Sequence, residues 1–145
     1  MTEPVEDRSS ILPIVVAAAI VAVVMGSMWA LSFFRSDKLP DDGLVVRAVV
    51  GQNDALQREN FADFRDFTCV AQQGTEPQVL SDQRQSKNAK GNRFVDDIKD
   101  FAITGDRATA TVAYHFDKKP DDKVTTPMTF VRENGTWKVC SPGPR

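Results

Sequence analysis

Residues 107–116 read RATATVAYHF, and this stretch decides the fold class of the C-terminal part of the chain. Every second side chain, from Ala108 through Val112 to Phe116, is apolar. Alternation with a period of two is the pattern of a β-strand that buries one face. The stretch is therefore predicted to be a strand of a sheet with one face against a core.

The segments on either side extend this strand into a sheet. Residues 94–104 also read as a strand, and the apolar parity changes near Asp100, where we expect a β-bulge. Gly105-Asp106 is predicted to form the turn between the two strands, and KKPDDK, residues 118–123, the turn that follows.

Two further strands complete the prediction. Residues 124–130 place Val124, Thr126, Met128 and Phe130 on one face. Asn134-Gly135 is a strong signal for a two-residue hairpin, and TWKVC, residues 136–140, supplies the last strand. The sequence thus predicts a four-stranded antiparallel meander.

Helical periodicity precedes the sheet. Asp41 and Asp42 are candidate N-caps for a helix over GLVVRAVVGQNDALQ, residues 43–57, in which Gly51 weakens the middle. One face of this helix carries Val45, Val49, Gln52 and Leu56, with Ala48 and Ala55 beside them.

A second helix is predicted over FADFRDFTCV, residues 61–70, capped by Asn60 and supplying Phe61, Phe64 and Phe67 to a core. A poorer third helix is expected from Glu76 to about Lys87, and SKNAKGN, residues 86–92, is expected to be a loop. Helices followed by an antiparallel meander predict an α+β domain over residues 41–145, with two to three helices covering one sheet face.

The N-terminal part contains an apolar run, ILPIVVAAAIVAVVMGSMWALSFF, at residues 11–34. At about 1.5 Å per residue a helix of this length spans roughly 36 Å, enough to cross a bilayer core of about 30 Å. We expect a single transmembrane helix after a short tail, residues 1–10, and before a linker, residues 35–40. A cleaved signal peptide is the alternative, but the leader is acidic and the run exceeds the usual length of such signals.

Small residues recur within this run. Ala18, Ala22, Gly26 and Ala30 are four residues apart and would form a stripe that permits close helix packing. Alanine is common in such helices, so the stripe has a compositional explanation as well as a functional one. The sequence predicts no oligomeric state.

The orientation of the predicted transmembrane helix is inferred from the cysteines, because the numbers of basic residues on its two flanks differ by only one. Cys69 and Cys140 are the only two, and their spacing suits neither a zinc site nor a redox motif. In a small membrane-tethered domain such a pair suggests a disulfide, and two separate buried thiols are the alternative. A disulfide places the C-terminal domain outside the cytoplasmic membrane, with the N-terminus in the cytoplasm.

The residues resemble a known family at this point. DALQRENFADFRDFTC and GTWKVC, together with a long antiparallel sheet, look like the nuclear-transport-factor-2-like (SnoaL-like) cone fold. More narrowly, the chain resembles small membrane-anchored actinobacterial proteins, including the Mce-associated membrane proteins and related antigens. The resemblance implies a curved sheet in a cone-shaped domain, and a disulfide between a cysteine ending the second helix and one in the last strand.

Chemistry-bearing residues are scarce. The only histidine, His115, has the parity of the polar side of its strand. The paired carboxylates Asp41-Asp42, Asp96-Asp97 and Asp121-Asp122 are explained by caps, turns or opposite strand faces. We expect no catalytic set, no metal site and no cofactor. From Asp41 onward, fifteen Lys/Arg stand against sixteen Asp/Glu, a balance that gives no basic field for nucleic acid.

The expected function is therefore non-catalytic. We predict an accessory protein of the cell envelope that binds other envelope proteins, and the resemblance extends this to a lipid-import assembly. The alternative is a carrier or sensor with an apolar ligand inside the cone, and filling of the core is the simpler role of the same side chains. The predicted lining of this ligand pocket is Tyr114, Phe116, Met128, Phe130 and Trp137.

Overall fold

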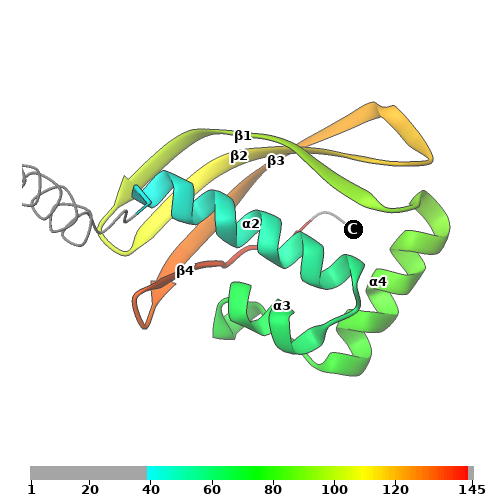
Figure 1. Cartoon of the computed structure of the whole chain (residues 1–145), viewed down its shortest axis with the longest axis horizontal. Coiled ribbons are helices and arrows are strands. Elements are labelled where there is room, and N and C mark those ends of the chain that lie inside the picture. The colour runs from blue at the N-terminus through cyan, green and yellow to red at the C-terminus, as the bar shows by residue number, and fades with distance from the viewer. Residues whose placement is uncertain (1–38, 144–145) are drawn as a thin grey trace, which may run out of the picture. The chain divides into compact units, whose positions relative to one another are not determined.

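The computed structural model describes residues 39–143 (Figure 1). Three α-helices come first: α2 (Asp41–Gln57), α3 (Phe61–Phe67) and α4 (Glu76–Lys90), with a 3-10 turn (Val70–Gln72) after α3. Four strands follow: β1 (Arg93–Thr104), β2 (Arg107–Phe116), β3 (Lys119–Glu133) and β4 (Thr136–Val139). The strands pair antiparallel in the order β1-β2-β3-β4, so the predicted α+β meander is confirmed.

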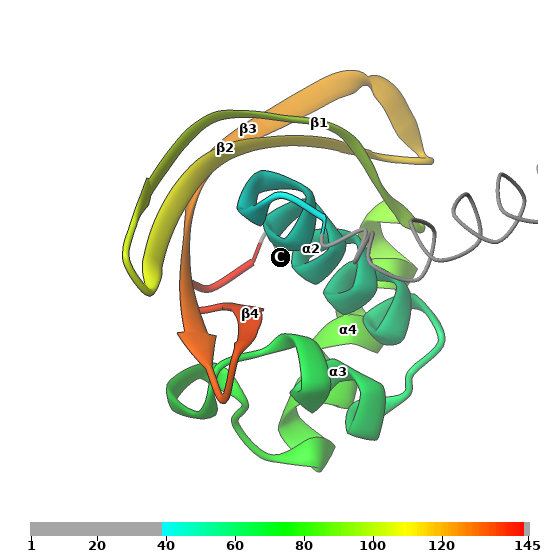
Figure 2. The ribbon, with the colours of Figure 1, turned by 60° about the vertical axis from the view of Figure 1, so that its left-hand side comes forward.

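The sheet is curved, and α2 lies inside its concave face (Figure 2). The helix turns Val45, Ala48 and Val49 toward the sheet, all at most 4% exposed. The alternating residues of β2 meet them from the other side, as their parity predicted. This arrangement is the cone expected from the resemblance, and its core is the helix–sheet interface.

The cap of α3 was predicted correctly. Asn60 Oδ1 accepts a hydrogen bond from the Asp63 N–H at 3.1 Å. The helix, however, ends at Phe67 and not at Val70. Thr68 is extended and forms an isolated parallel bridge with Val139 of β4, so the tertiary contact with the sheet ends the helix early.

Two predicted loops are wrong. SKNAKGN is helical through Lys90, and α4 ends only where Gly91 adopts a φ of 88°. Lys87 and Lys90 in the last turn favour this extension because they complement the helix dipole. A Cβ on Gly91 would overlap the Asp117 carboxylate, so the chain reversal at this point requires glycine.

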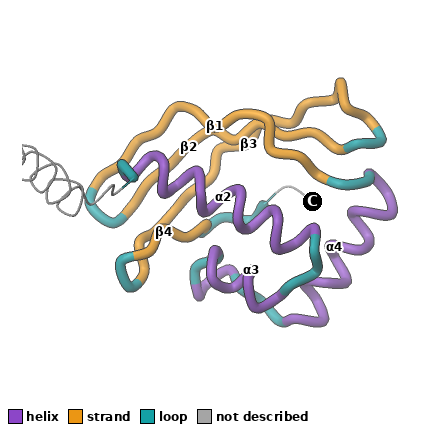
Figure 3. Tube along the Cα trace, in the orientation of Figure 1, coloured by secondary structure: helices purple, strands orange, loops and turns teal. Residues whose placement is uncertain are grey.

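Of KKPDDK, only Lys118 belongs to the turn, and residues 119–123 are the start of β3, which is drawn as strand in Figure 3. The turn is only two residues long, Asp117 and Lys118. The register then jumps from Phe116↔Lys119 to Tyr114↔Val124, which leaves residues 120–123 bulged out of the ladder. Pro120 has no N–H to donate, and this favours its departure from the ladder.

β1 contains the predicted irregularity. Its register shifts between Lys99 and Ala102, and Asp100 has a φ of 56°. A second shift lies between Val95 and Asp97. The Asn134-Gly135 hairpin is also confirmed, with both residues at positive φ.

The start of α2 differs from the prediction. Pro40 occupies the N-cap position, and Asp41 is the first helical residue. The Asp41 carboxylate accepts hydrogen bonds from Trp137 Nε1 at 3.1 Å and Arg132 Nη2 at 2.8 Å. The Asp41 carboxylate is therefore bound by residues on β3 and β4, although its local propensity predicts a helix cap.

The predicted tail (1–10), the transmembrane helix (11–34) with its small-residue stripe, and most of the linker (35–40) lie outside the described residues. Among residues 39–143, no helix has the length and apolarity needed to cross a membrane.

Candidate functional site

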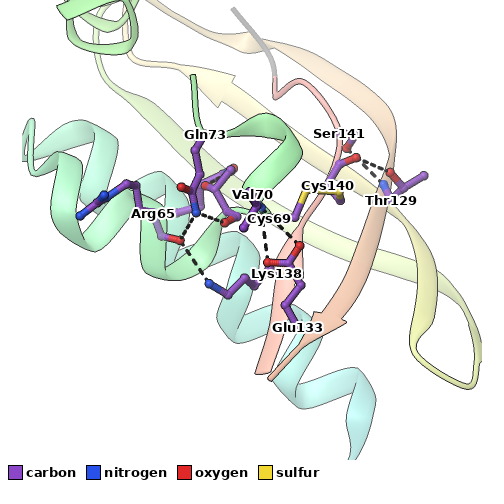
Figure 4. Close-up of a disulfide and its surroundings, with 11 residues drawn as sticks. Arg65, Cys69, Val70, Gln73, Thr129, Glu133, Lys138, Cys140 and Ser141 are labelled. Atoms are coloured by element: carbon purple, nitrogen blue, oxygen red, sulfur yellow. Dashed lines mark hydrogen bonds between the residues drawn. A yellow bond between two sulfur atoms is a disulfide. The ribbon is translucent and has the colours of Figure 1, made fainter. Parts of the chain in front are cut away.

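A disulfide between Cys69 and Cys140 joins the end of α3 to the end of β4 (Figure 4). The backbone supports the same joint, because Cys69 N–H donates to the Val139 carbonyl at 2.9 Å and Cys140 N–H to the Thr129 carbonyl at 2.8 Å. The expected pairing is confirmed. The bond closes the helical layer onto the last strand.

The five predicted pocket-lining residues are all buried, between 1% and 8% exposed. Trp137 Nε1 donates to Asp41, and the Tyr114 hydroxyl lies 3.2 Å from Thr126 Oγ1. Phe130 borders a hollow of about 380 Å³ on β2 and β3, and Phe116 borders a larger one described below. The structure thus packs most of this set into the core against α2.

The larger hollow is an open groove of about 570 Å³ between the end of α4 and the β2–β3 hairpin. We call it the lysine groove, because four of its eight lining residues are lysines. Its members are Ala89, Lys90, Phe116, Lys118, Lys119, Asp122, Lys123 and Val124.

The lysine groove was not predicted from the sequence. Three of the lysines fall within residues 118–123, a local density of positive charge that is visible in the sequence. Lys90 is remote in sequence, and only the docking of α4 against the hairpin brings it to the other three.

A smaller, polar hollow of about 120 Å³ lies among α2, α4 and the residues after β4. Gln52 Nε2 donates to Thr68 Oγ1 at 2.8 Å, and Arg93 Nε donates to Asn53 Oδ1 at 2.7 Å. Burial lowers the pKa of Arg93 to about 10, so its guanidinium remains charged at neutral pH. A space this small holds about four water molecules and is below the size of most ligand pockets.

His115 lies on the outer side of the sheet, away from the core, as predicted. Its Nδ1 is 2.8 Å from Asp96 Oδ1, and its ring stacks on Phe94 at 5.2 Å between centroids. Lys123 Nζ is 3.6 Å from the other oxygen of Asp96. Within residues 39–143, no three His, Cys, Asp or Glu side chains gather closely enough to hold a metal ion.

The remaining predicted carboxylates are dispersed. The Asp42 carboxylate accepts a hydrogen bond from the Gly43 N–H at 2.9 Å, and Asp121 and Asp122 are exposed on the bulged start of β3. Asp41 forms a contact between elements, the clamp with Arg132 and Trp137, as Asp96 does with His115 and Lys123.

This clamp predicts a dependence of stability on pH. The hydrogen bond from Trp137, followed by the hydrogen bond and charge of Arg132, lowers the pKa of Asp41 below its usual 3.8. The ionised form therefore stabilises the fold above pH 3.8, and this contribution is lost as the pH falls through the lowered pKa. Urea midpoints of wild type and Asp41→Asn should differ most at about pH 7 and approach each other as the pH falls below 3.8. A difference that is constant with pH would contradict this role.

Comparison with known proteins relates this geometry to a family. The model of the family described as "Low molecular weight antigen MTB12, C-terminal domain" matches residues 68–141, just over half of the chain. The match runs from the end of α3 through β4 and includes both cysteines. No curated protein sequence matches the chain.

Three solved structures are similar in fold. A proposed NTF2-like transpeptidase from Campylobacter jejuni is 15% identical, with 63% of this chain and 92% of that chain covered and a TM-score of 0.45. An NTF-2-like protein of unknown function from Shewanella oneidensis is 14% identical, with 69% of this chain and 94% of that chain covered and a TM-score of 0.46. A proposed dehydratase of the NTF2-like family from Streptomyces avermitilis is 18% identical, with 68% of this chain and 90% of that chain covered and a TM-score of 0.44. We draw nothing about activity from similarities at this level.

Proposed function

The chain belongs to the family of the C-terminal domain of the low molecular weight antigen MTB12, and we propose that it is a non-catalytic accessory protein of the cell envelope. In this proposal residues 11–34 anchor the chain in the cytoplasmic membrane. The domain that follows lies on the outer side of the membrane and binds other envelope proteins. The resemblance described above suggests a lipid-import assembly as the partner.

The observation that carries the proposal is the Cys69–Cys140 disulfide. Structural disulfides persist in oxidising compartments and are rare in the cytosol. A domain outside the cytoplasmic membrane meets that requirement. The apolar run in front of the domain supplies a means of holding it there.

Packing of the cone supports a role in binding at the surface. Tyr114, Phe130 and Trp137 are each at most 2% exposed and occupy the concave side of the sheet together with α2. A substrate pocket needs a hollow with a few convergent polar groups. Here that volume is taken up by apolar side chains, so the outer surface is what the domain presents to partners.

The proposal is tested by affinity purification of the full chain from its native envelope after mild solubilisation. We expect another envelope protein to be recovered in near-stoichiometric amount. Peptide mass spectrometry without reduction of the same material should show Cys69 linked to Cys140. A full chain recovered alone would contradict the accessory role, and two free thiols would contradict the location.

A matched control separates the anchor from the domain. In one chimera, residues 1–38 are kept and the rest is replaced by an unrelated exported domain. In a second variant, Gly26→Leu interrupts the small-residue stripe. If the domain binds the partner, the partner is lost from the chimera and retained by Gly26→Leu. The reverse result would assign the contact to the stripe and overturn the proposal for the domain.

The alternative of an apolar ligand inside the cone stays a prediction. Among the described residues, two hollows have a size that suits a ligand, the lysine groove and the hollow of about 380 Å³, and each includes one residue of the set predicted for the cone, Phe116 and Phe130 respectively.

A further inference from the structure

The lysine groove is held open by a defined set of hydrogen bonds. Asp117 N–H donates to the Asn92 carbonyl at 2.9 Å, and Lys118 N–H donates to the Lys90 carbonyl at 3.3 Å. Lys118 Nζ also donates to the Asn88 carbonyl at 2.6 Å. The hairpin is thereby tied to the last turn of α4, which forms one wall, while the bulged start of β3 forms the other.

The charge of the groove is strongly positive. Four lysines line it against the single carboxylate of Asp122. Lys119 Nζ lies 3.9 Å from Asp122, with both side chains nearly 80% exposed, and Lys123 Nζ lies 3.6 Å from Asp96. The Lys119–Asp122 pair is exposed and long and holds its charges weakly, so an anion can compete for Lys119, whereas Lys123 is paired with an Asp96 side chain that is only 18% exposed.

Part of the lining of the groove is apolar. Phe116 is 8% exposed, with Lys90 Nζ at 5.1 Å from its ring centroid, and Val124 is 41% exposed. Ala89 completes the apolar part of the lining. The methylene stems of the lysines add further apolar surface below their charged ends. Cations and hydrocarbon in one groove match a molecule that has an anionic head and an apolar chain.

We propose that the lysine groove binds a single-chain anionic amphiphile, such as a fatty acid or an alkyl phosphate. The head lies at the exposed ammonium group of Lys119, and the first part of the chain lies on Phe116 and Val124, while Lys123, whose Nζ lies beside Asp96, adds positive charge from farther away. The volume of about 570 Å³ falls within the range of small-molecule sites. Strand addition by a peptide fits less well, because Pro120 and Pro127 interrupt this part of β3.

Binding of an amphiphile by the groove does not depend on the accessory role, and its test shares with the proposed function only the membrane anchor at residues 11–34. A protein partner can be absent while the groove binds its amphiphile, and the reverse also holds, so the two experiments fail separately.

The test uses the full chain in its native membrane and a fatty acid that carries a diazirine in its chain and an alkyne tag. After irradiation, the labelled peptides are mapped by mass spectrometry. We expect labels on peptides that contain Ala89–Lys90 or residues 116–124. Labels confined to residues 11–34 would reflect contact with bulk lipid and would overturn the proposal.

Variants distinguish the two parts of the site. Lys119→Gln with Lys123→Gln removes two exposed charges without touching the bonds that tie the hairpin to α4, and should lower labelling of the groove about ten-fold. Val124→Asn should also lower it. Arg47→Gln with Lys99→Gln changes the net charge equally on exposed positions outside the groove and should leave labelling unchanged. Equal loss in this control pair would contradict a specific site.

Competitors identify the ligand chemistry. Unlabelled decanoate and decyl phosphate should both suppress the label, because they share an anionic head and a chain. If inorganic phosphate and butyrate compete equally well, the site recognises charge alone. If decanol does so, the site recognises the chain alone. Either result, or competition by an acidic peptide in place of decanoate, would overturn the proposal.

Discussion

Replacing Cys69 and Cys140 together by alanine is expected to lower the free energy of unfolding by about 4 kcal/mol. The disulfide joins residues 71 positions apart, and in the chain-entropy model closing a loop of that length restricts the unfolded chain by about this amount. A domain of about 105 residues has a total stability of only about 5–15 kcal/mol, so the loss is a large fraction of it. Urea unfolding followed by tryptophan fluorescence measures the difference.

The matched control is the wild-type protein with its disulfide reduced, which should unfold at the midpoint of the double variant. Single replacements leave one unpaired thiol and should be no more stable than the double variant. The backbone contacts of Cys69 with Val139 and of Cys140 with Thr129 should survive in the folded variant, because they need no sulfur. Equal stability with and without the bond would show that these contacts alone hold the joint.

Gly51→Ala is expected to destabilise the domain by about 1–2 kcal/mol, although helix propensity alone predicts a gain of about 1 kcal/mol. A Cβ at Gly51 would lie 2.5–2.7 Å from three atoms of the Phe67 ring. The ring would have to leave its position on α2, and overpacking of this kind costs about 1–3 kcal/mol. The tertiary contact therefore reverses the sign of the local effect.

Gly43→Ala is the control in the same helix. Its Cβ would meet Leu39 at 3.6 Å, an ordinary contact, so this variant should be neutral or slightly stabilising. Combining Gly51→Ala with Phe67→Leu should recover part of the loss, since the smaller side chain removes the overlap. If the double variant is no better than the sum of the two single ones, the Phe67 ring is not the cause.

Much of the fold could be predicted because local signals agreed with the tertiary structure. The alternation in residues 107–116 corresponds to β2, and its apolar face is buried as expected. Asn60 caps α3, and Asn134-Gly135 forms the last hairpin. At each of these positions the side chain or the φ angle needed is a property of the residue itself.

Predictions failed where a partner remote in sequence decided the outcome. Asp41 is a good cap residue, but Trp137 and Arg132 bind its carboxylate. α3 ends at Phe67 because Thr68 joins β4. KKPDDK has the composition of a turn, yet it forms one wall of the lysine groove, because the hairpin turns earlier and is tied to α4. No local pattern contains these contacts.

Local patterns were enough to predict the α+β class, the strand alternation and the presence of a cysteine pair, because periodicity, turn chemistry and residue count can all be read along the chain. Tertiary structure decided that the predicted pocket residues are buried in the core and that four lysines separated by up to 33 positions line one groove. The reason is physical: α2 fills the concave side of the sheet, and the last turn of α4 docks on a hairpin that it meets only after folding.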